Sequence, residues 1–533
     1  MFPQSQILKI IVTSDLHGQI AYQPAKKQPG LARFLTYLNN LRKSGPVILL
    51  DLGDLLSGSV YGAFDRGRTL ASLVGRLGYR GLLPGNHDFD YSPEEREPLY
   101  YFKSLIPLVK AAGSPELEVL GLNLHYQNKP ISGVLNKPLI LKASTPRIAV
   151  LGVLNPLTHR PSLGTVLNGF DFGLKDTLAR TKKDLLAELT RELLAFSPQD
   201  HIIILSHLGA PDRPGQVSGL AGQLDLDFDN NLTGPDLAGL PNVSLVIDGH
   251  SHEVIRPHRI NGRARYANLG QGLTAAAEIT YEGNGPLRLD LIDWSSLSAL
   301  PPDLPTQKEI EKIEAALGLN EILLSLPTNC ALYGLKGIWE TITPLGQFIA
   351  EALAMAAEAD FSFLNKGALR AGLAGPVTVG SLHEVLPFND RLLRTQISGR
   401  TVKDLFKKWG LKGFKGFPLY YGLELWAYID DSSYLPLGEE TIRLAGLTAD
   451  GRPLEDDRLY SLALSGQMVR LLTGAGVQPG DRLDCGRILE AVLALLRKRA
   501  GQTFLHNPLD SPYRLFVDRA AAEKAFGNIQ MST

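Results

Sequence analysis

The sequence has few cysteines and no long apolar run, and both shortages limit its function. Cys330 and Cys485, the only two cysteines, stand far apart, which argues against a disulfide framework or a thiolate zinc site. No apolar run approaches the ~18–20 residues that a helix needs to cross a bilayer. Charge is balanced as well, because 54 Lys and Arg face 55 Asp and Glu, for a formal net charge of -1. We therefore expect neither a membrane nor a nucleic acid as a partner.

The N-terminus and the length bound the location and the domain count. Residues 1–18 run into a strand without the charged, apolar and small-residue regions of a secretion signal. We expect a cytoplasmic protein, or an exported one whose signal has been removed. With 533 residues, the chain is too long for one core and fits two to four domains of roughly 100–200 residues each.

Several predicted strands end in residues that bind hard or borderline divalent cations. Apolar runs at residues 7–12, 47–50, 202–205 and 243–247 predict buried strands, and a helical pattern between the first two indicates a β-α-β unit. The carboxyl ends of strands in an open α/β sheet form one rim, so residues distant in sequence converge there. The candidate ligands at these ends are Asp15, His17, Asp54, Asn86, His207, His250 and His252.

The number of candidate ligands indicates two cations. A lone buried histidine is more often a hydrogen-bonded core residue than a metal ligand, but chance poorly explains five such coincidences at strand ends. Seven ligands exceed one shell that keeps a position open for substrate, whereas two cations with a bridging carboxylate need about this number. We expect two divalent metal ions bridged by Asp54. Asp, His and Asn ligands without sulfur suit Mn, Fe, Zn or Co.

The stretch PGNHDFD, residues 84–90, adds a candidate proton donor. His87 can carry a proton near neutral pH, and Asp90 can fix its ring and tautomer. A polar turn that caps a helix would also explain this stretch, but not the ligands at the other strand ends. Two cations ~3.5–4 Å apart acidify a shared water to hydroxide and stabilise charge on an attacked phosphoryl group. We therefore predict hydrolysis of a phosphate ester, with His87 and Asp90 as the catalytic pair.

These motifs resemble those of a known family. DLHG, DLGDLLSG, LGYRGLLPGNHDFD, ILSHLG and DGHSH are similar to the motif series of the calcineurin-like metallophosphoesterases, and NKGALR and LPFND resemble the C-terminal domain of the 5'-nucleotidase family. The resemblance implies an α/β fold, with a four-layer α/β/β/α catalytic domain followed by a smaller α/β substrate-binding domain. We place these domains at residues 1–295 and 338–526, with a linker at 296–337 and a tail at 527–533.

The resemblance also implies how the ligands divide. Asp15, His17, Asp54 and His252 would hold one cation, and Asp54, Asn86, His207 and His250 the other. In the second domain, the family binds its nucleotide through an arginine after a Gly-rich loop and two aromatic rings around the base. The matching substrate-binding residues here are Asn365, Gly367, Arg370, Phe388 and Asp390.

The second domain departs from the family pattern. Its PFGN motif is PFND here, and residues 460–474 lack both the second aromatic and the GGDGY-like turn. Stacking on one side alone forfeits roughly 1–3 kcal/mol. The substrate is therefore a nucleotide held differently, with Tyr420, Tyr421 or Trp409 as a substitute ring, or another small phosphorylated compound. Arg370 could otherwise be a surface residue, and Phe388 a core residue.

We predict a metal-dependent phosphomonoesterase of the 5'-nucleotidase type, acting on nucleotides or related small phosphate esters. The alternatives are a phosphodiesterase for cyclic or dinucleotide-like substrates and a hydrolase of a sulfur-linked anion. A non-catalytic protein that binds a ligand and keeps the metals is a further alternative. The presence of His87 and Asp90 argues against it, because a binding module has no evident use for a proton donor.

Overall fold

The structure, a computed structural model, divides into two compact units, Met1–Ala316 and Leu317–Thr533. This division falls inside the linker predicted at residues 296–337. Among the described residues, no helix combines the length and the apolar character that crossing a bilayer requires. Phe388 and the predicted tail at 527–533 lie outside the described residues. The structure describes residues 7–91, 97–142, 144–154, 170–171, 182–209, 232–260, 262, 264–283, 285–325, 331–332, 343–387, 390–411, 417–429, 442–474, 476–499, 513–516, 519–520 and 523–526.

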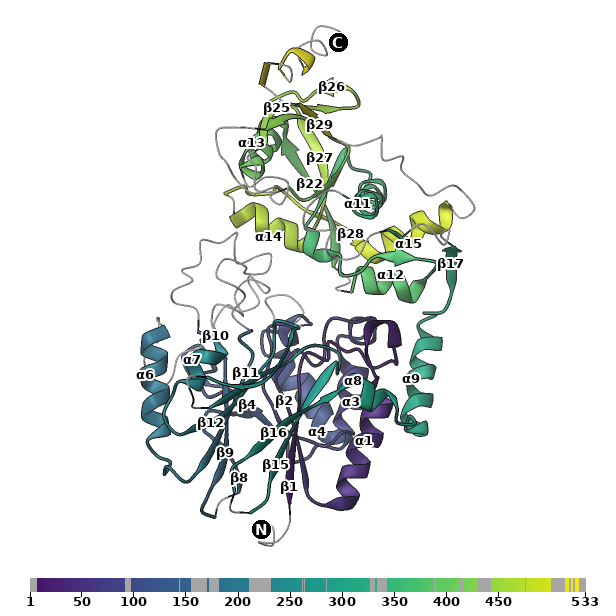
Figure 1. Ribbon diagram of the computed structural model, residues 1–533. Helices are drawn as coiled ribbons and strands as arrows, with labels where there is room; N and C mark the ends of the chain where they lie inside the picture. The colour runs from purple at the N-terminus through teal and green to yellow at the C-terminus, as the bar shows by residue number, and fades with distance from the viewer. Residues whose placement is uncertain are drawn as a thin grey trace. The chain divides into compact units, whose positions relative to one another are not determined.

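The first unit contains a seven-stranded sheet in the order β16-β15-β1-β2-β3-β4-β7 (Figure 1). The run from β1 to β7 is parallel, β15 pairs antiparallel with β1, and β16 pairs antiparallel with β15. β1 is buried over most of its length and β2 over its second half, as their continuous apolar sequences predict. The strands are β1 (Leu8–Thr13), β2 (Val47–Asp51), β3 (Tyr79–Leu82), β4 (Glu118–Leu120), β7 (Val134–Leu135), β15 (Ala275–Tyr281) and β16 (Arg288–Asp293).

A second sheet of six strands, in the order β13-β14-β12-β11-β9-β8, packs against the first. Gly152 on β9 faces Leu120 on β4, where a Cβ on the glycine would lie 2.7 Å from the leucine Cβ. The two sheets therefore meet closely at this point. The strands are β8 (Leu139–Lys142), β9 (Ile148–Val153), β11 (His201–Ser206), β12 (Val243–Asp248), β13 (Val254–Arg259) and β14 (Arg265–Leu269), and a smaller sheet holds β5 (His125–Tyr126), β6 (Lys129–Pro130) and β10 (Phe170–Asp171).

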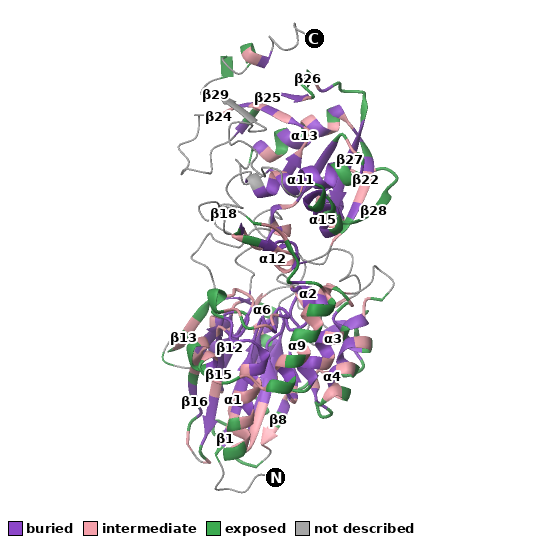
Figure 2. Cartoon of the chain, turned by 90° about the vertical axis from the view of Figure 1, so that its right-hand side faces the viewer, coloured by how far each residue is buried: buried purple, intermediate pink, exposed green. Residues whose placement is uncertain are grey.

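Helices cover the outer face of each sheet, which gives four layers in the order α/β/β/α (Figures 1 and 2). On the second sheet, Leu189 of α6 and Leu237 of α7 pack in one cluster with Ile204 of β11. The residues coloured as buried concentrate in the sheets between these helices (Figure 2). The helices are η1 (Pro24–Lys26), α1 (Leu31–Ser44), α2 (Val60–Ala63), α3 (Arg68–Gly75), η2 (His87–Phe89), η4 (Tyr101–Leu105), α4 (Ile106–Ala112), α6 (Lys182–Leu193), α7 (Gly234–Ala238), α8 (Trp294–Ser298) and α9 (Leu304–Ala316).

The second unit has a five-stranded sheet in the order β23-β19-β27-β22-β28, with helices on both faces (Figure 1). Alternation along β27 explains this, because Ala463 faces one hydrophobic cluster while Leu462 and Leu464 face the other. The strands of this sheet are β19 (Phe361–Leu364), β22 (Arg391–Ser398), β23 (Leu419–Tyr421), β27 (Leu459–Ser465) and β28 (Leu483–Arg487). The first cluster includes residues of α11 (Pro344–Ala356), α12 (Val379–Val385) and α15 (Ile488–Lys498), and the second residues of α13 (Gly399–Gly410) and α14 (Gly466–Gly474).

Smaller strands complete the second unit. Four of them form a sheet in the order β26-β25-β24-β29, and two separate two-stranded antiparallel sheets pair β17 with β21 and β18 with β20. Their bounds, with one short helix, are β17 (Ile322–Ser325), β18 (Ala331–Leu332), η8 (Lys366–Ala368), β20 (Leu373–Ala374), β21 (Pro376–Thr378), β24 (Glu424–Ile429), β25 (Ile442–Ala449), β26 (Arg452–Pro453) and β29 (Tyr513–Phe516).

Candidate metal centre

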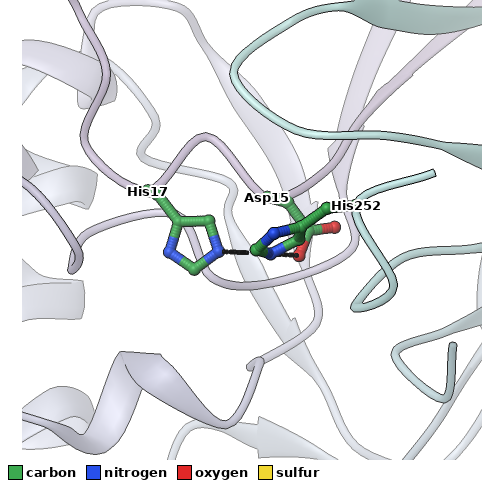
Figure 3. A group of neighbouring side chains, drawn as sticks. All are labelled: Asp15, His17 and His252. Atoms are coloured by element: carbon green, nitrogen blue, oxygen red, sulfur yellow. Dashed lines mark hydrogen bonds and ion pairs between the residues drawn. The ribbon is translucent and has the colours of Figure 1, made fainter. Parts of the chain in front are cut away.

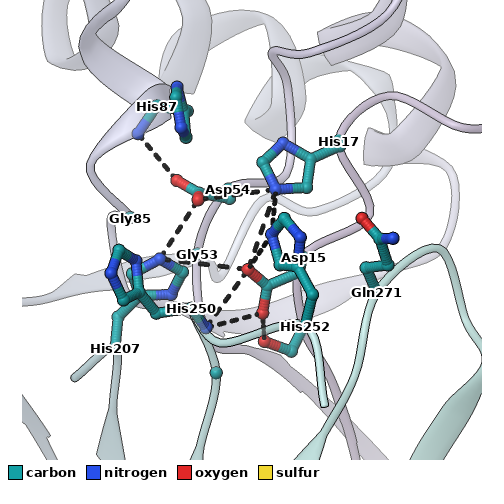
Figure 4. A network of polar contacts seen from close by, with 12 residues as sticks. Asp15, His17, Gly53, Asp54, Gly85, His87, His207, His250, His252 and Gln271 are labelled. Atoms are coloured by element: carbon teal, nitrogen blue, oxygen red, sulfur yellow. Dashed lines mark hydrogen bonds and ion pairs between the residues drawn. The ribbon is translucent and has the colours of Figure 1, made fainter. Parts of the chain in front are cut away.

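The seven predicted ligands follow the carboxyl ends of five strands in the first unit. The loops after β1, β2 and β3 of one sheet carry Asp15, His17, Asp54 and Asn86. The loops after β11 and β12 of the other sheet carry His207, His250 and His252. The structure brings six of them into two groups, in each of which the ligand atoms lie within 4.8 Å of one another (Figures 3 and 4). The first group is Asp15, His17 and His252, and the second is Asp54, His207 and His250.

In the first group, two imidazole nitrogens and a carboxylate oxygen point toward one another (Figure 3). Nε2 of His17 lies 2.9 Å from Nε2 of His252, and these atoms lie 3.8 Å and 3.5 Å from Oδ1 of Asp15. On its other side, Nδ1 of His17 is 3.1 Å from the carbonyl oxygen of Ser57. A proton donated there leaves the Nε2 lone pair for a cation, the arrangement that a metal-binding histidine needs.

The second group has the same construction. Nε2 of His207 lies 3.1 Å from Oδ2 of Asp54, and its Nδ1 lies 2.9 Å from the carbonyl oxygen of Leu52. Nδ1 of His250 lies 3.0 Å from Oδ1 of Asn86. The seventh predicted ligand, Asn86, therefore adds a neutral oxygen to this group.

Asp54 lies between the two groups (Figure 4). Its Oδ2 is 3.1 Å from Nε2 of His207 and 3.6 Å from Nε2 of His17, so one oxygen faces a histidine of each group. Its Oδ1 accepts a hydrogen bond of 2.7 Å from the backbone N–H of His87. This position is the one that a carboxylate bridging two cations must occupy.

The backbone is strained at most of these positions. A left-handed conformation costs a residue other than glycine roughly 1–3 kcal/mol, and it persists only where the surroundings impose it. Such residues cluster at functional sites. The candidate ligands with positive φ are Asp15 (47°), His17 (48°), Asp54 (53°), His250 (75°) and His252 (60°).

The electrostatics of the groups favour cation binding. Burial opposes the charge of Asp15, but His207 and His252 outweigh it and lower the pKa of Asp15 to about 2. Burial lowers the pKa of His17 to about 3. Burial also disfavours a charged His207, but Asp54 and Asp15 prevail and raise its pKa to about 10. Ionised carboxylates and a neutral imidazole are the forms that bind metals, so Asp15 and His17 are in the binding form at neutral pH, whereas His207 carries a proton that a cation must displace. The carboxylates that hold this proton also attract a cation to this point.

His87 and Asp90 form a pair beside these groups. Nδ1 of His87 lies 2.7 Å from Oδ2 of Asp90, and the His87 ring centre lies 5.4 Å from that of His17. Ser57 Oγ donates a 2.6 Å hydrogen bond to the carbonyl oxygen of His87 and lies 3.3 Å from Oδ2 of Asp90. Since Asp90 engages Nδ1, Nε2 is the atom of His87 that can hold or release a proton.

Three buried aspartates that the sequence analysis did not single out support the ligand-bearing loops. Asp51 accepts hydrogen bonds from Thr13 Oγ1 (2.6 Å) and from the Gly53 N–H (2.8 Å). Asp248 accepts one of 2.9 Å from the Leu208 N–H. The third is Asp88. Each lies within the motif of a ligand, in DLGD, NHD or DGH, and an aspartate within three residues of a candidate ligand is the signal that could have identified them.

The predicted substrate residues of the second unit fall near two strand ends. Oδ1 of Asn365, just after β19, lies 3.3 Å from Oγ of Ser465 at the end of β27. The carboxylate of Asp390 accepts hydrogen bonds from the N–H of Arg391 (2.9 Å) and of Gln467 (3.4 Å), the latter at the start of α14. Asp390 therefore contacts the first turn of this helix, whose N-cap is Ser465, the acceptor of a 3.0 Å hydrogen bond from the Met468 N–H.

Gly367 and Arg370 lie on the chain that leaves β19. Gly367 belongs to the short helix η8, and the backbone N–H of Arg370 donates a 2.9 Å hydrogen bond to the carbonyl oxygen of Val385. Phe388 lies outside the described residues.

Tyr420, proposed above as a substitute stacking ring, is not accessible to a base. It is 1% exposed and packs in the core, with its ring centre 5.2 Å from that of Phe406. Trp409 packs edge-on against Phe406 and Phe363 in the same core. The alternation along β23 turns Tyr420 inward, and its neighbour Tyr421 is only partly buried.

Each of the two units contains a region that matches a known protein-family model. The family model described as calcineurin-like phosphoesterase matches residues 8–254, and the model described as 5'-nucleotidase, C-terminal domain, matches residues 337–470. The trifunctional nucleotide phosphoesterase protein YfkN of Bacillus subtilis is 25% identical over 78% of this chain. The 5'-nucleotidase of Vibrio cholerae is 24% identical over 74% of each chain.

The chain spans 29% of the length of YfkN and 38% of the length of the Bacillus subtilis endonuclease YhcR, which is 22% identical. Among solved structures, a 5'-nucleotidase precursor from Thermus thermophilus superimposes with a TM-score of 0.66 at 18% identity, covering 96% of this chain and all of that one. A sulfate thiohydrolase from the same organism gives 0.62 at 16% identity, with 97% and 98% covered. These superpositions confirm the predicted fold. Because a 5'-nucleotidase precursor and a sulfate thiohydrolase share this fold, the fold alone does not identify the substrate.

Proposed function

This chain belongs to the 5'-nucleotidase family of metallophosphoesterases, and from that premise we propose that it hydrolyses phosphate monoesters, with nucleotides as the substrate class. The observation that carries the proposal is the position of Asp54 between two groups of metal-binding side chains. Relatives named as nucleotide phosphoesterase and 5'-nucleotidase support the substrate class. Asp15, His17, Asp54 and His252 would hold one cation, and Asp54, Asn86, His207 and His250 would hold the other.

The donor set decides which metals fit. Imidazole nitrogens, carboxylate oxygens and one amide oxygen suit Mn, Fe, Zn or Co. Two such ions supply a Lewis acid for a phosphoryl oxygen and lower the pKa of a bound water.

The chain's own residues orient the substrate and move the proton. Asp90 holds Nδ1 of His87 at 2.7 Å, which fixes the ring and stabilises its protonated form. Nε2 of His87 then donates a proton to the leaving oxygen, or a hydrogen bond to the charge that develops on the phosphoryl group.

The second unit would supply the contacts to the rest of the substrate. A guanidinium beside a glycine-containing loop suits bidentate recognition of phosphate or carboxylate, which favours Arg370 with Asn365 and Gly367. Phe388 would stack on the base. Asp390 would act at this site by holding the start of α14 beside Asn365 and Ser465.

The experiment is a turnover assay on protein reconstituted with Mn²⁺, Zn²⁺, Fe²⁺ or Co²⁺. p-Nitrophenyl phosphate, its bis ester, nucleoside monophosphates and sugar phosphates are compared. We expect hydrolysis of monoesters with a preference for nucleotides, and a kcat at least ~100-fold lower in His87→Ala, the usual effect of losing a general acid. His258→Ala, which removes an exposed histidine of β13, is the matched control.

The outcomes separate the alternatives. Preference for the bis ester would assign a phosphodiesterase instead. No turnover with any metal or ester, although two metals bind, would leave a binding protein and overturn the proposal. Indifference to the base would mean that the second unit does not recognise a nucleoside.

A further inference from the structure

Asp88 occupies a central place in the first unit although it belongs to neither group of candidate ligands. It is 1% exposed, and both of its carboxylate oxygens accept backbone hydrogen bonds. Oδ1 accepts from the N–H of Leu55 (3.1 Å) and of Leu56 (3.2 Å). Oδ2 accepts from the N–H of Asp54 (2.9 Å) and of Gly85 (2.9 Å). One side chain thus fastens four amides from two loops.

These loops touch because glycines stand at their contact. A Cβ on Gly53 would lie 2.3 Å from the backbone nitrogen of Gly85, and a Cβ on Gly85 would lie 2.2 Å from Oδ1 of Asp54. Real Cβ atoms do not approach other atoms so closely. The loop after β2 and the loop after β3 therefore meet backbone to backbone.

Side chains of both loops belong to the candidate site. The loop after β2 carries Asp54, which has a left-handed backbone with φ of 53°. The loop after β3 carries Asn86 and His87, and the His87 N–H donates to Oδ1 of Asp54. A strained backbone keeps its conformation only if neighbouring groups impose it. The hydrogen bond from the Asp54 amide to Asp88 acts on the strained residue itself.

We propose that Asp88 is a positioning residue, which locks the loop of Asp54 against the loop of Asn86 and His87 so that the bridging carboxylate and the proton donor keep one geometry. The proposal rests on the proposed function for the roles of Asp54 and His87. The carboxylate of Asp88 accepts from all four amides, whereas the side-chain amide of an asparagine would turn a donor toward at least one N–H. Asp88→Asn has nearly the same shape but loses this property.

The test compares Asp88→Asn with Asp200→Asn. Asp200 is also buried, at 4% exposed, and accepts from the N–H of Arg147 (2.7 Å) and of Ser197 (2.9 Å), but it precedes β11 at the end remote from His207. Mn²⁺ binding is measured by titration and by metal analysis. The values of kcat and KM are measured with p-nitrophenyl phosphate as the substrate.

Changes to groups that orient metal ligands typically reduce metal affinity or activity about 10–100-fold. We expect Asp88→Asn to weaken Mn²⁺ binding and lower kcat by about that factor with little change in KM. We expect Asp200→Asn to lower the melting temperature while Mn²⁺ binding and kcat stay at the wild-type values. Asp88→Glu, which keeps the charge but displaces the carboxylate, should regain only part of the loss.

The inference and the proposed function fail differently. Wild-type affinity and kcat in Asp88→Asn, with only a lower melting temperature, would overturn the inference alone. Wild-type protein that binds Mn²⁺ without turnover would overturn the proposed function, while the binding measurement still decides the inference. If Asp88→Asn does not fold, hydrogen exchange of the wild type decides, because rapid exchange of the Leu55 and Leu56 amides would contradict their bonding to Asp88.

Discussion

Aspartates act in two ways at the candidate metal centre, and their surroundings decide which. The carboxylates of Asp15 and Asp54 face histidine ring nitrogens in addition to backbone N–H groups, whereas those of Asp51, Asp88 and Asp248 are held by backbone N–H groups and hydroxyls. Burial raises the pKa of Asp248 to about 6, and burial with the nearby Asp54 raises that of Asp88 to about 7. Aspartate therefore serves both as a candidate metal ligand and as a support of the ligand-bearing loops.

Ser57 links the proton donor to the first group of ligands. Its Oγ donates to the carbonyl oxygen of His87 and lies near Asp90, and its own carbonyl oxygen faces Nδ1 of His17. In Ser57→Ala only the hydroxyl contacts disappear. A typical hydrogen bond contributes about 1 kcal/mol, so we expect kcat to fall roughly 3–10-fold because His87 is held less firmly. Steady-state kinetics with p-nitrophenyl phosphate measure it.

Metal content checks the interpretation of Ser57→Ala. The variant keeps the carbonyl oxygen that faces His17, so it should bind as much Mn²⁺ as the wild type. Ser114→Ala removes another buried hydroxyl, which donates a 2.7 Å hydrogen bond to the carbonyl oxygen of Gly75. This hydroxyl contacts none of the candidate ligands in the described hydrogen bonds, so the variant should leave kcat unchanged. Equal losses of kcat in the two variants would contradict a specific role of Ser57.

Residues of the site differ in how far the sequence predicts them. The seven ligands stand directly after apolar runs, and their residue types bind cations, so their convergence follows from the rim formed by parallel strands. The support by Asp88 depends on two loops touching at Gly53 and Gly85, a contact that no periodicity in the sequence encodes.

At the level of elements, the long buried strands are predicted well. The run at 202–205 is the centre of β11, and the run at 243–247 covers most of β12. Continuous β-branched and apolar residues suit strands that are covered on both faces. The short strands β5, β6 and β10 have no such signal, because two residues carry no period. Tyr420 was misjudged because its direction depends on which face of β23 meets α13.

Helix α14 offers a prediction about the second unit. Asp390 accepts from the Gln467 N–H in the first turn of this helix. Loss of one hydrogen bond costs about 1 kcal/mol, or ~2–4 °C in the melting temperature of a domain of this size. In Asp390→Ala we expect that loss in the second unit, together with a several-fold rise in KM for a nucleotide, because the start of α14 moves relative to Asn365. Calorimetry and steady-state kinetics measure both.

The conservative variant is the control for this prediction. Asp390→Asn keeps an acceptor oxygen for the helix amides and should restore both the melting temperature and KM. If Asp390→Asn instead raises KM as much as Asp390→Ala at a normal melting temperature, the charge of Asp390 contacts the substrate directly.

On the scale of the whole molecule, the two units hold different parts of the proposed function. All seven candidate ligands and the His87–Asp90 pair belong to the first unit, Met1–Ala316. The residues proposed to bind the part of the substrate beyond its phosphate belong to the second. Each unit has hydrophobic clusters of its own, so each has the means to unfold as a separate transition.

Metal removal should therefore destabilise only one unit. A ligand that binds the native state stabilises it by RT ln(1 + [L]/Kd), about 2.7 kcal/mol at a hundredfold excess over Kd. The strained backbones of Asp15, His17 and Asp54 also lose their partner when the cations leave. By differential scanning calorimetry of the full chain with Mn²⁺ or with a chelator, we expect the transition of the first unit to fall by roughly 5–10 °C while that of the second stays in place. Equal shifts of both transitions would mean that the units unfold together, and no shift would mean that the cations are not bound by the folded first unit.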